Sequence, residues 1–69
     1  MEELKLRDEF IKLGQAMKAA GIVSSGIDAK MLIQDGQVTV NGEVETRRGT
    51  KLYDGDVFEF EGEEFKVVK

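Results

Sequence analysis

The fold is decided by one stretch, residues 24–52, which is SSGIDAKMLIQDGQVTVNGEVETRRGTKL. At its start, the hydroxyl of Ser24 or Ser25 can accept a hydrogen bond from a free backbone amide, as a helix N-cap does. Asp28 then lies in the predicted first turn, where the helix dipole favours an acidic side chain. Gly36 is a typical stop, because glycine readily adopts the left-handed conformation that ends helices. The stretch therefore begins with a short capped helix.

A β-hairpin is predicted to follow this helix. Residues 37–40 alternate valine with polar side chains, which places both valines on one face of a strand. Asn41-Gly42 is the strongest short-range signal for a hairpin turn, and residues 43–45 form the returning strand. The next segment, residues 46–51, is polar and basic, and we expect a loop or an irregular strand there.

The N-terminal part supplies another helix that can pack against the first. Its apolar residues recur at the spacing of one helical face, and they are Leu13, Ala16, Met17 and Ala20. Gly21 is a suitable stop for this helix. The corresponding stripe on the capped helix is Ala29, Leu32 and Ile33. Two short helices joined by a few residues should pack together as a pair.

Both ends of the chain are predicted to contribute strands. Residues 3–7 alternate charged and apolar side chains, which is typical of a half-buried edge strand. Asp8 and Glu9 would then form a turn or the entry to the first helix. The C-terminal part is expected to hold turns at residues 54–55 and 61–63 and strands at residues 57–60 and 64–68.

Composition limits the chemistry that this chain can perform. The 69 residues suit one domain, 1–69, and contain no Cys and no His. Disulfides, thiolate metal sites and the usual acid–base group at neutral pH are therefore missing. No nucleophile has a visible base partner in the sequence, and no glycine-rich nucleotide loop is present. We expect neither catalysis nor a cofactor nor a bound metal.

The sequence also offers no sign of a membrane protein. No apolar run approaches the roughly 18 residues of a membrane span. The N-terminus, MEELKLRDEF, lacks the apolar region of a signal peptide. We expect a cytoplasmic protein with no membrane partner.

Charge is distributed unevenly along the chain. The formal net charge of −4 by itself disfavours a nucleic-acid partner. However, residues 12–53 carry six basic and four acidic side chains, whereas residues 54–69 carry six acidic and two basic ones. A phosphate group responds to the local field, which is screened beyond about 8–10 Å. The basic middle of the chain is therefore still a candidate for binding RNA.

The motifs of this middle region, in their order and spacing, resemble those of the S4 RNA-binding domain. The segments that carry the resemblance lie within residues 12–60 and are AKMLIQDG, QVTVNGEV, TRRGTKL and YDGDVFEF. Two details, VSSGIDAK and NGEVETRRGTKL, are similar to a small stand-alone bacterial subgroup of that family. The resemblance implies an α+β fold with the αL RNA-binding motif, in which two short packed helices lie on a small, mainly antiparallel sheet.

The resemblance implies RNA contacts for five of the predicted RNA-binding residues, which are Lys12, Lys30, Arg47, Arg48 and Lys51. We add Lys18, which would extend the basic patch along the helix pair, Gln15, which could hydrogen-bond RNA, and Tyr53, the one aromatic residue beside the basic loop. The two arginines offer planar donors that match phosphate geometry, and the tyrosine could stack on a base. The chain departs from the family where Gln15, Gly26 and Met31 stand at positions that are often basic, which makes the helix face less basic than in many members.

Each of these assignments has a structural alternative. Arg47 and Arg48 could belong to a solvated loop in which they pair with Glu43 and Glu45. Lys18 could be an ordinary solvent-facing lysine, and a glutamine is often only a helix former. The four phenylalanines are expected in the core because of their strand periodicity.

We therefore expect a non-catalytic domain that binds structured RNA, either ribosomal or tRNA-like, through phosphate contacts from the basic patch. A ribosomal particle as partner follows only by analogy with the family. We also expect a monomer. The alternative is a protein-interaction module that uses its acidic strand edge and its basic loop.

Overall fold

Two helices and seven strands build the computed structural model, which describes residues 1–69. In chain order, the elements are β1 (Glu2–Lys5), β2 (Phe10–Lys12), α1 (Leu13–Ala19), α2 (Gly26–Gln34), β3 (Val38–Val40), β4 (Glu43–Val44), β5 (Lys51–Tyr53), β6 (Val57–Phe60) and β7 (Glu63–Val68). The α+β class and the pair of short helices are as the sequence predicts.

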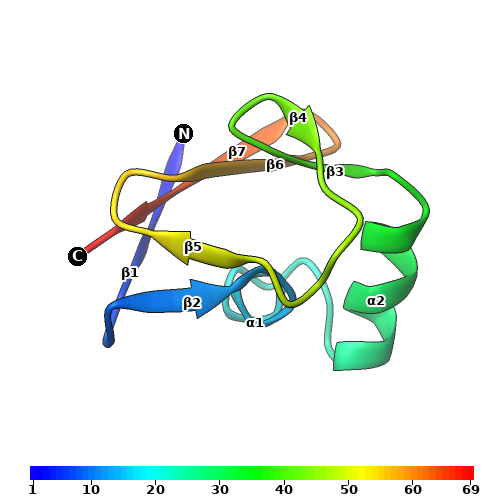
Figure 1. Ribbon diagram of the computed structural model, residues 1–69, viewed down its shortest axis with the longest axis horizontal. Coiled ribbons are helices and arrows are strands. Elements are labelled where there is room, and N and C mark those ends of the chain that lie inside the picture. Colours follow the sequence, from blue (N-terminus) through cyan, green and yellow to red (C-terminus); the bar gives the residue numbers. More distant parts are fainter.

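The strands form two separate sheets. The larger sheet has five strands in the order β1-β7-β6-β3-β4, and only the β1–β7 pair is parallel. The smaller sheet is an antiparallel ribbon of β2 and β5. In Figure 1 this ribbon runs below the larger sheet, α1 continues directly from β2, and α2 lies on the side away from the two termini.

The Asn41-Gly42 turn both closes one hairpin and ties it to the next. Both residues have positive φ angles, 51° and 87°, as a two-residue turn between twisted strands requires. The Asn41 side chain accepts a hydrogen bond from the Val57 amide at 3.0 Å and donates one to Asp56 Oδ1 at 3.1 Å. This turn therefore holds the β3–β4 hairpin against the start of β6.

The helices begin and end as their sequences predict. Ser25 is the N-cap of α2, because its hydroxyl accepts a hydrogen bond from the Asp28 amide at 3.2 Å. Gly21 and Gly36 follow the two helices with φ angles of 79°. After α1, for example, the amide of Ile22 donates to the carbonyl of Met17, which is the bond that defines a Schellman motif.

One apolar core joins both helices and both sheets. Its eleven buried residues are Leu6, Leu13, Ala16, Met17, Ala29, Ile33, Val38, Leu52, Phe58, Phe65 and Val67. Phe58 and Phe65 are register partners on β6 and β7, and their rings stack with centroids 5.0 Å apart. Leu32 and Phe60 are only half-buried against this core.

The structure decides between two alternatives at one place and corrects the sequence-based assignment at another. Asp8 and Glu9 lie in a bend, as the turn alternative predicts, and β2 rather than a helix follows them. The end of the predicted loop, at Lys51, belongs to β5. Each of these strands has only three residues, and each is stabilised by pairing with the other. A segment that short carries no periodicity of its own.

Two isoleucines on α2 provide a test of the helix facing. Ile33 is fully buried, whereas Ile27 is 70% exposed. We expect Ile33→Ala to lower the free energy of unfolding by about 2–5 kcal/mol, because it leaves a cavity. Ile27→Ala should change it by about 0.5 kcal/mol or less. Urea unfolding followed by circular dichroism measures both, and equal losses would contradict the facing of α2.

Candidate nucleic-acid interface

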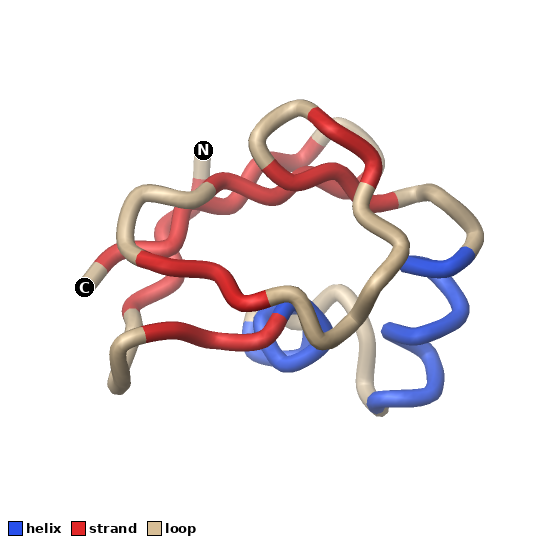
Figure 2. The backbone as a smooth tube through the Cα atoms, in the orientation of Figure 1, coloured by secondary structure: helices blue, strands red, loops and turns tan.

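Backbone hydrogen bonds attach the basic loop, residues 45–50, to the first turn of α1. The Leu13 amide donates to the Thr50 carbonyl at 2.8 Å, and the Gly14 amide donates to the Arg48 carbonyl at 3.0 Å. The N-cap, Lys12, gives α1 no side-chain cap. The loop carbonyls therefore accept the hydrogen bonds that the first helical amides need. Figure 2 shows the loop descending from β4 of the larger sheet to this helix start.

This attachment creates a hollow at the surface, which we call the basic hollow. It has a volume of about 310 Å³, and none of the residues that line it is acidic or hydrophobic. They are Lys12, Gly14, Gln15, Lys18, Gly26, Arg48 and Gly49. Four of the eight predicted site residues therefore line one hollow, although they come from β2, α1 and the basic loop.

Three glycines keep the basic hollow open. A Cβ atom added at Gly14 would lie 3.5 Å from both the Cβ and the carbonyl oxygen of Arg48. At Gly26 and Gly49 such an atom would meet nothing within 4 Å. Gly26 is also the first residue of α2, where free amides and the helix dipole favour an anion. Backbone donors can thus be approached at this surface.

Sequence reasoning assigned Gly14 and Gly26 no part in the site. The signal was nevertheless present at Gly14, because a glycine within a helix costs up to about 1 kcal/mol relative to alanine. Packing against Arg48 does not itself require glycine, because an added Cβ atom would make ordinary van der Waals contact at 3.5 Å, but it places Gly14 directly against the loop.

Lys51 and Tyr53 lie beside the basic hollow on β5. Lys51 is the register partner of Lys12, and its Nζ atom lies 4.8 Å from the centroid of the Phe10 ring. The Tyr53 ring is 5.9 Å from the same phenylalanine and is 49% exposed. Phe10 is half-buried and contacts both Lys51 and Tyr53, whereas Phe58 and Phe65 are in the core.

Arg47 and Arg48 have different surroundings. Arg47 forms the chain's one salt bridge, with 3.3 Å between its Nε atom and Glu45 Oε2, and its side chain is 82% exposed. Arg48 forms none and lines the basic hollow. Pairing with a glutamate of the loop, which is the structural alternative for the two arginines, is thus seen for Arg47 and not for Arg48.

Glu45 is held in its ionised form by its neighbours. Burial opposes ionisation, but the Arg47 amide, the Thr50 hydroxyl and the Arg47 guanidinium together lower the pKa of this carboxyl below 4.5. The amide donates to Glu45 Oε2 at 3.1 Å. The buried Thr50 Oγ1 atom affects that pKa without reaching full hydrogen-bond geometry. This carboxylate therefore orders the beginning of the basic loop.

Lys30 is the one predicted site residue on α2. It is exposed on α2, one turn beyond Gly26 and on the same side of the helix, but it does not line the basic hollow. It can extend the positive surface along α2 without sharing a ligand with Arg48.

The arrangement is suited to holding anions. Five of the six predicted cations form no salt bridge within the chain, so their charge is available to a ligand. No group of three His, Cys, Asp or Glu side chains is placed to hold a metal ion. Neither helix has the length and apolar character needed to cross a membrane.

Comparisons with known proteins agree on one family. A model described as S4 domain matches residues 4–68. The Bacillus subtilis (strain 168) protein named "Probable ribosome maturation protein RlbA" is 46% identical over 66 residues, covering 94% of this chain and 93% of that protein. The protein YbcJ of Escherichia coli (strain K12) is 40% identical over 58 residues, covering 84% and 83%. The solution structure of YbcJ, described as having an alfaL motif involved in RNA binding, matches with a TM-score of 0.75 and 36% identity over 100% of this chain and 89% of that one.

The lowered pKa of Glu45 predicts a change of stability with pH. When the pKa of a carboxyl is lower in the folded state than in the unfolded state, its ionised form stabilises the fold. That contribution is complete at a pH above the pKa of the unfolded state, about 4.5, and is lost as the pH falls through the pKa of the folded state. Glu45→Gln should therefore lower the melting temperature at pH 7, and the difference from the parent should shrink below pH 4.5.

Thermal unfolding between pH 7 and pH 3 measures this effect. Glu43→Gln is the matched control, because Glu43 is exposed and forms no salt bridge. A difference between Glu45→Gln and the parent that is constant over this pH range would show that the carboxylate does not order the loop.

Proposed function

The chain belongs to the S4 domain family, and from that premise we propose that it binds structured RNA through the basic hollow. Family membership agrees with the resemblance seen in the sequence, and the family match at residues 4–68 extends beyond the 12–60 segment on both sides. RNA binding is supported by the description of the YbcJ structure, which has the same fold. We propose no catalytic role.

The observation that carries the proposal is the convergence of Lys12, Lys18 and Arg48 around a hollow without an acidic residue. Cations brought together from three segments repel one another in the free protein. A phosphate ligand would reduce that repulsion. Binding would also release counterions that are condensed on the RNA, and this release is the main source of affinity in such complexes. The net charge of −4 does not oppose this, because no acid lines the basic hollow.

Each group around the basic hollow would have a different part in binding. Arg48 can donate two parallel hydrogen bonds to one phosphate, while Lys12 and Lys18 act as point charges. The amide at Gly26 adds a neutral donor at a helix start. Tyr53, exposed at the edge of the β2–β5 ribbon, is placed to stack on an unpaired base. Such a site reads the shape of a folded RNA rather than a sequence.

Ribosomal RNA is the target that we propose first. The support is the printed name of the Bacillus subtilis relative, which refers to ribosome maturation, and the high coverage of both chains in that match. A role in the assembly of a ribosomal particle would also place the protein in the cytoplasm.

Removal of two cations from the basic hollow tests the site. We expect Lys18→Ala combined with Arg48→Ala to weaken binding to a structured ribosomal RNA fragment about tenfold or more. The slope of log K against log salt concentration should fall by roughly one to two, since each lost phosphate contact removes about one unit. Fluorescence anisotropy at several salt concentrations measures both quantities.

Lys66→Ala is the control for the loss of one positive charge elsewhere, because Lys66 is exposed on β7 and does not line the basic hollow. It should leave the affinity and the salt slope almost unchanged. If Lys66→Ala weakened binding as much per charge as the double variant, RNA would be held by net charge alone and the site assignment would be wrong.

The unequal surroundings of the two arginines give a second prediction. Arg48→Ala should weaken RNA binding more than Arg47→Ala, because the Nε atom of Arg47 is already engaged with Glu45 and the nearby carboxylate repels a phosphate. The difference should be modest, since an exposed ion pair of this kind contributes only about 0–1 kcal/mol. The same anisotropy titration compares the two variants, and a larger loss with Arg47→Ala would reverse the assignment.

A further inference from the structure

A second hollowed surface lies between α2 and the β6–β7 turn, and it has the opposite character. Three adjoining hollows form it: the first shares Gly21 and Ile22 with the second and Met31 and Leu32 with the third. We call this continuous surface the acidic groove. It shares no lining residue with the basic hollow.

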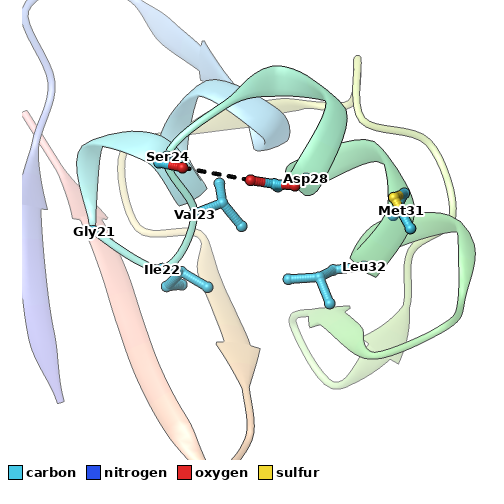
Figure 3. Close-up of a pocket in the computed structure, with 7 residues that line it drawn as sticks. All are labelled: Gly21, Ile22, Val23, Ser24, Asp28, Met31 and Leu32. Atoms are coloured by element: carbon cyan, nitrogen blue, oxygen red, sulfur yellow. Dashed lines mark hydrogen bonds between the residues drawn. The ribbon is translucent and has the colours of Figure 1, made fainter.

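The floor of the acidic groove is apolar. Its largest hollow has a volume of about 700 Å³ and is lined mainly by Ile22, Val23, Met31 and Leu32. Figure 3 shows Ile22 and Leu32 on opposite sides of the opening with Val23 between them. Met31 is 65% exposed, whereas the other three side chains are half-buried against the core. The groove thus offers an apolar seat that the chain itself does not cover.

The charged residues of the acidic groove all have one sign. They are Asp28, Asp35, Glu61 and Glu63, and no Lys or Arg lines any of the three hollows. None of these carboxylates forms a salt bridge within the chain. The ligand must therefore bring apolar side chains for the floor and positive charges for the rim.

We propose that the acidic groove binds a lysine- and arginine-rich segment of another protein, in which one or two large apolar side chains enter the space beside Ile22 and Leu32. Complementary charge would speed the encounter, and the apolar residue would hold the complex. RNA is a poor occupant because the four carboxylates repel phosphates. A second copy of this chain is also disfavoured, because the basic hollow that could face the four carboxylates is lined by no hydrophobic residue and so brings no apolar side chain for the floor.

This inference goes beyond RNA binding and does not depend on it. Because the two surfaces have separate lining residues, each can be tested with the other intact. If both exist, the chain can hold RNA and a basic protein segment on separate surfaces.

A synthetic peptide of Lys and Arg with two central Leu residues, labelled with a fluorophore, is the probe. We expect saturable binding to the full chain by anisotropy, and an affinity about tenfold lower with Met31→Gln, the factor that corresponds to about 1.4 kcal/mol. Ile27→Gln is the matched control, because Ile27 is an exposed apolar residue of the same helix outside the groove. It should bind the peptide as the parent does.

Charge is tested in the same way. Glu61→Gln with Glu63→Gln should weaken peptide binding severalfold, whereas Glu2→Gln with Glu3→Gln, an equal charge change on β1, should not. Lys18→Ala with Arg48→Ala should leave peptide binding unchanged even if RNA binding is lost, so the two proposals fail independently.

Three results would overturn the proposal. The first is no binding of the peptide, and the second is equally tight binding of a peptide in which Ala replaces both Leu residues, since that would be attraction by charge alone. The third is a dimer in analytical ultracentrifugation that Met31→Gln dissociates, because a second copy would then occupy the acidic groove.

Discussion

The candidate site depends on two backbone hydrogen bonds, from Leu13 to Thr50 and from Gly14 to Arg48. They satisfy amides that every α-helix leaves free in its first turn. In doing so they join two parts of the chain that are more than thirty residues apart, α1 and the basic loop. Without this attachment Lys18 of α1 and the arginines of the loop would be separate charges on separate elements. One requirement of local backbone chemistry thus assembles a multivalent cationic surface.

Much of the scaffold around that attachment could be predicted because its signals are local. Asn41-Gly42 defines a hairpin turn through backbone preferences of two residues, and Gly21 and Gly36 end the helices for the same reason. The β2–β5 ribbon could not be predicted, since two strands of three residues form only by pairing across the chain. The residue types of the candidate site could be predicted from the sequence. The different surroundings of Arg47 and Arg48 could not, because they depend on which of the two arginines forms the ion pair with Glu45.

The folded chain separates charges that the sequence only partly segregates. A net charge of −4 conceals a hollow lined by three cations and a groove lined by four carboxylates. Because fields at a protein surface are set by nearby groups and are screened over about 8–10 Å, each surface can select its own ligand. The acidic residues would also help to orient the molecule on RNA, since carboxylates repel phosphates. Overall acidity is therefore compatible with RNA binding in a protein of this size.

The most direct test of the central claim uses the glycine amides as reporters in a nuclear magnetic resonance titration with a structured ribosomal RNA fragment. Gly14, Gly26 and Gly49 line the basic hollow, whereas Gly42 and Gly62 lie in turns elsewhere. If RNA phosphates bind in the basic hollow, the first three amide signals will move with one common saturation curve, and the other two will stay in place. Movement of Gly42 and Gly62 with the first three unchanged would contradict the account.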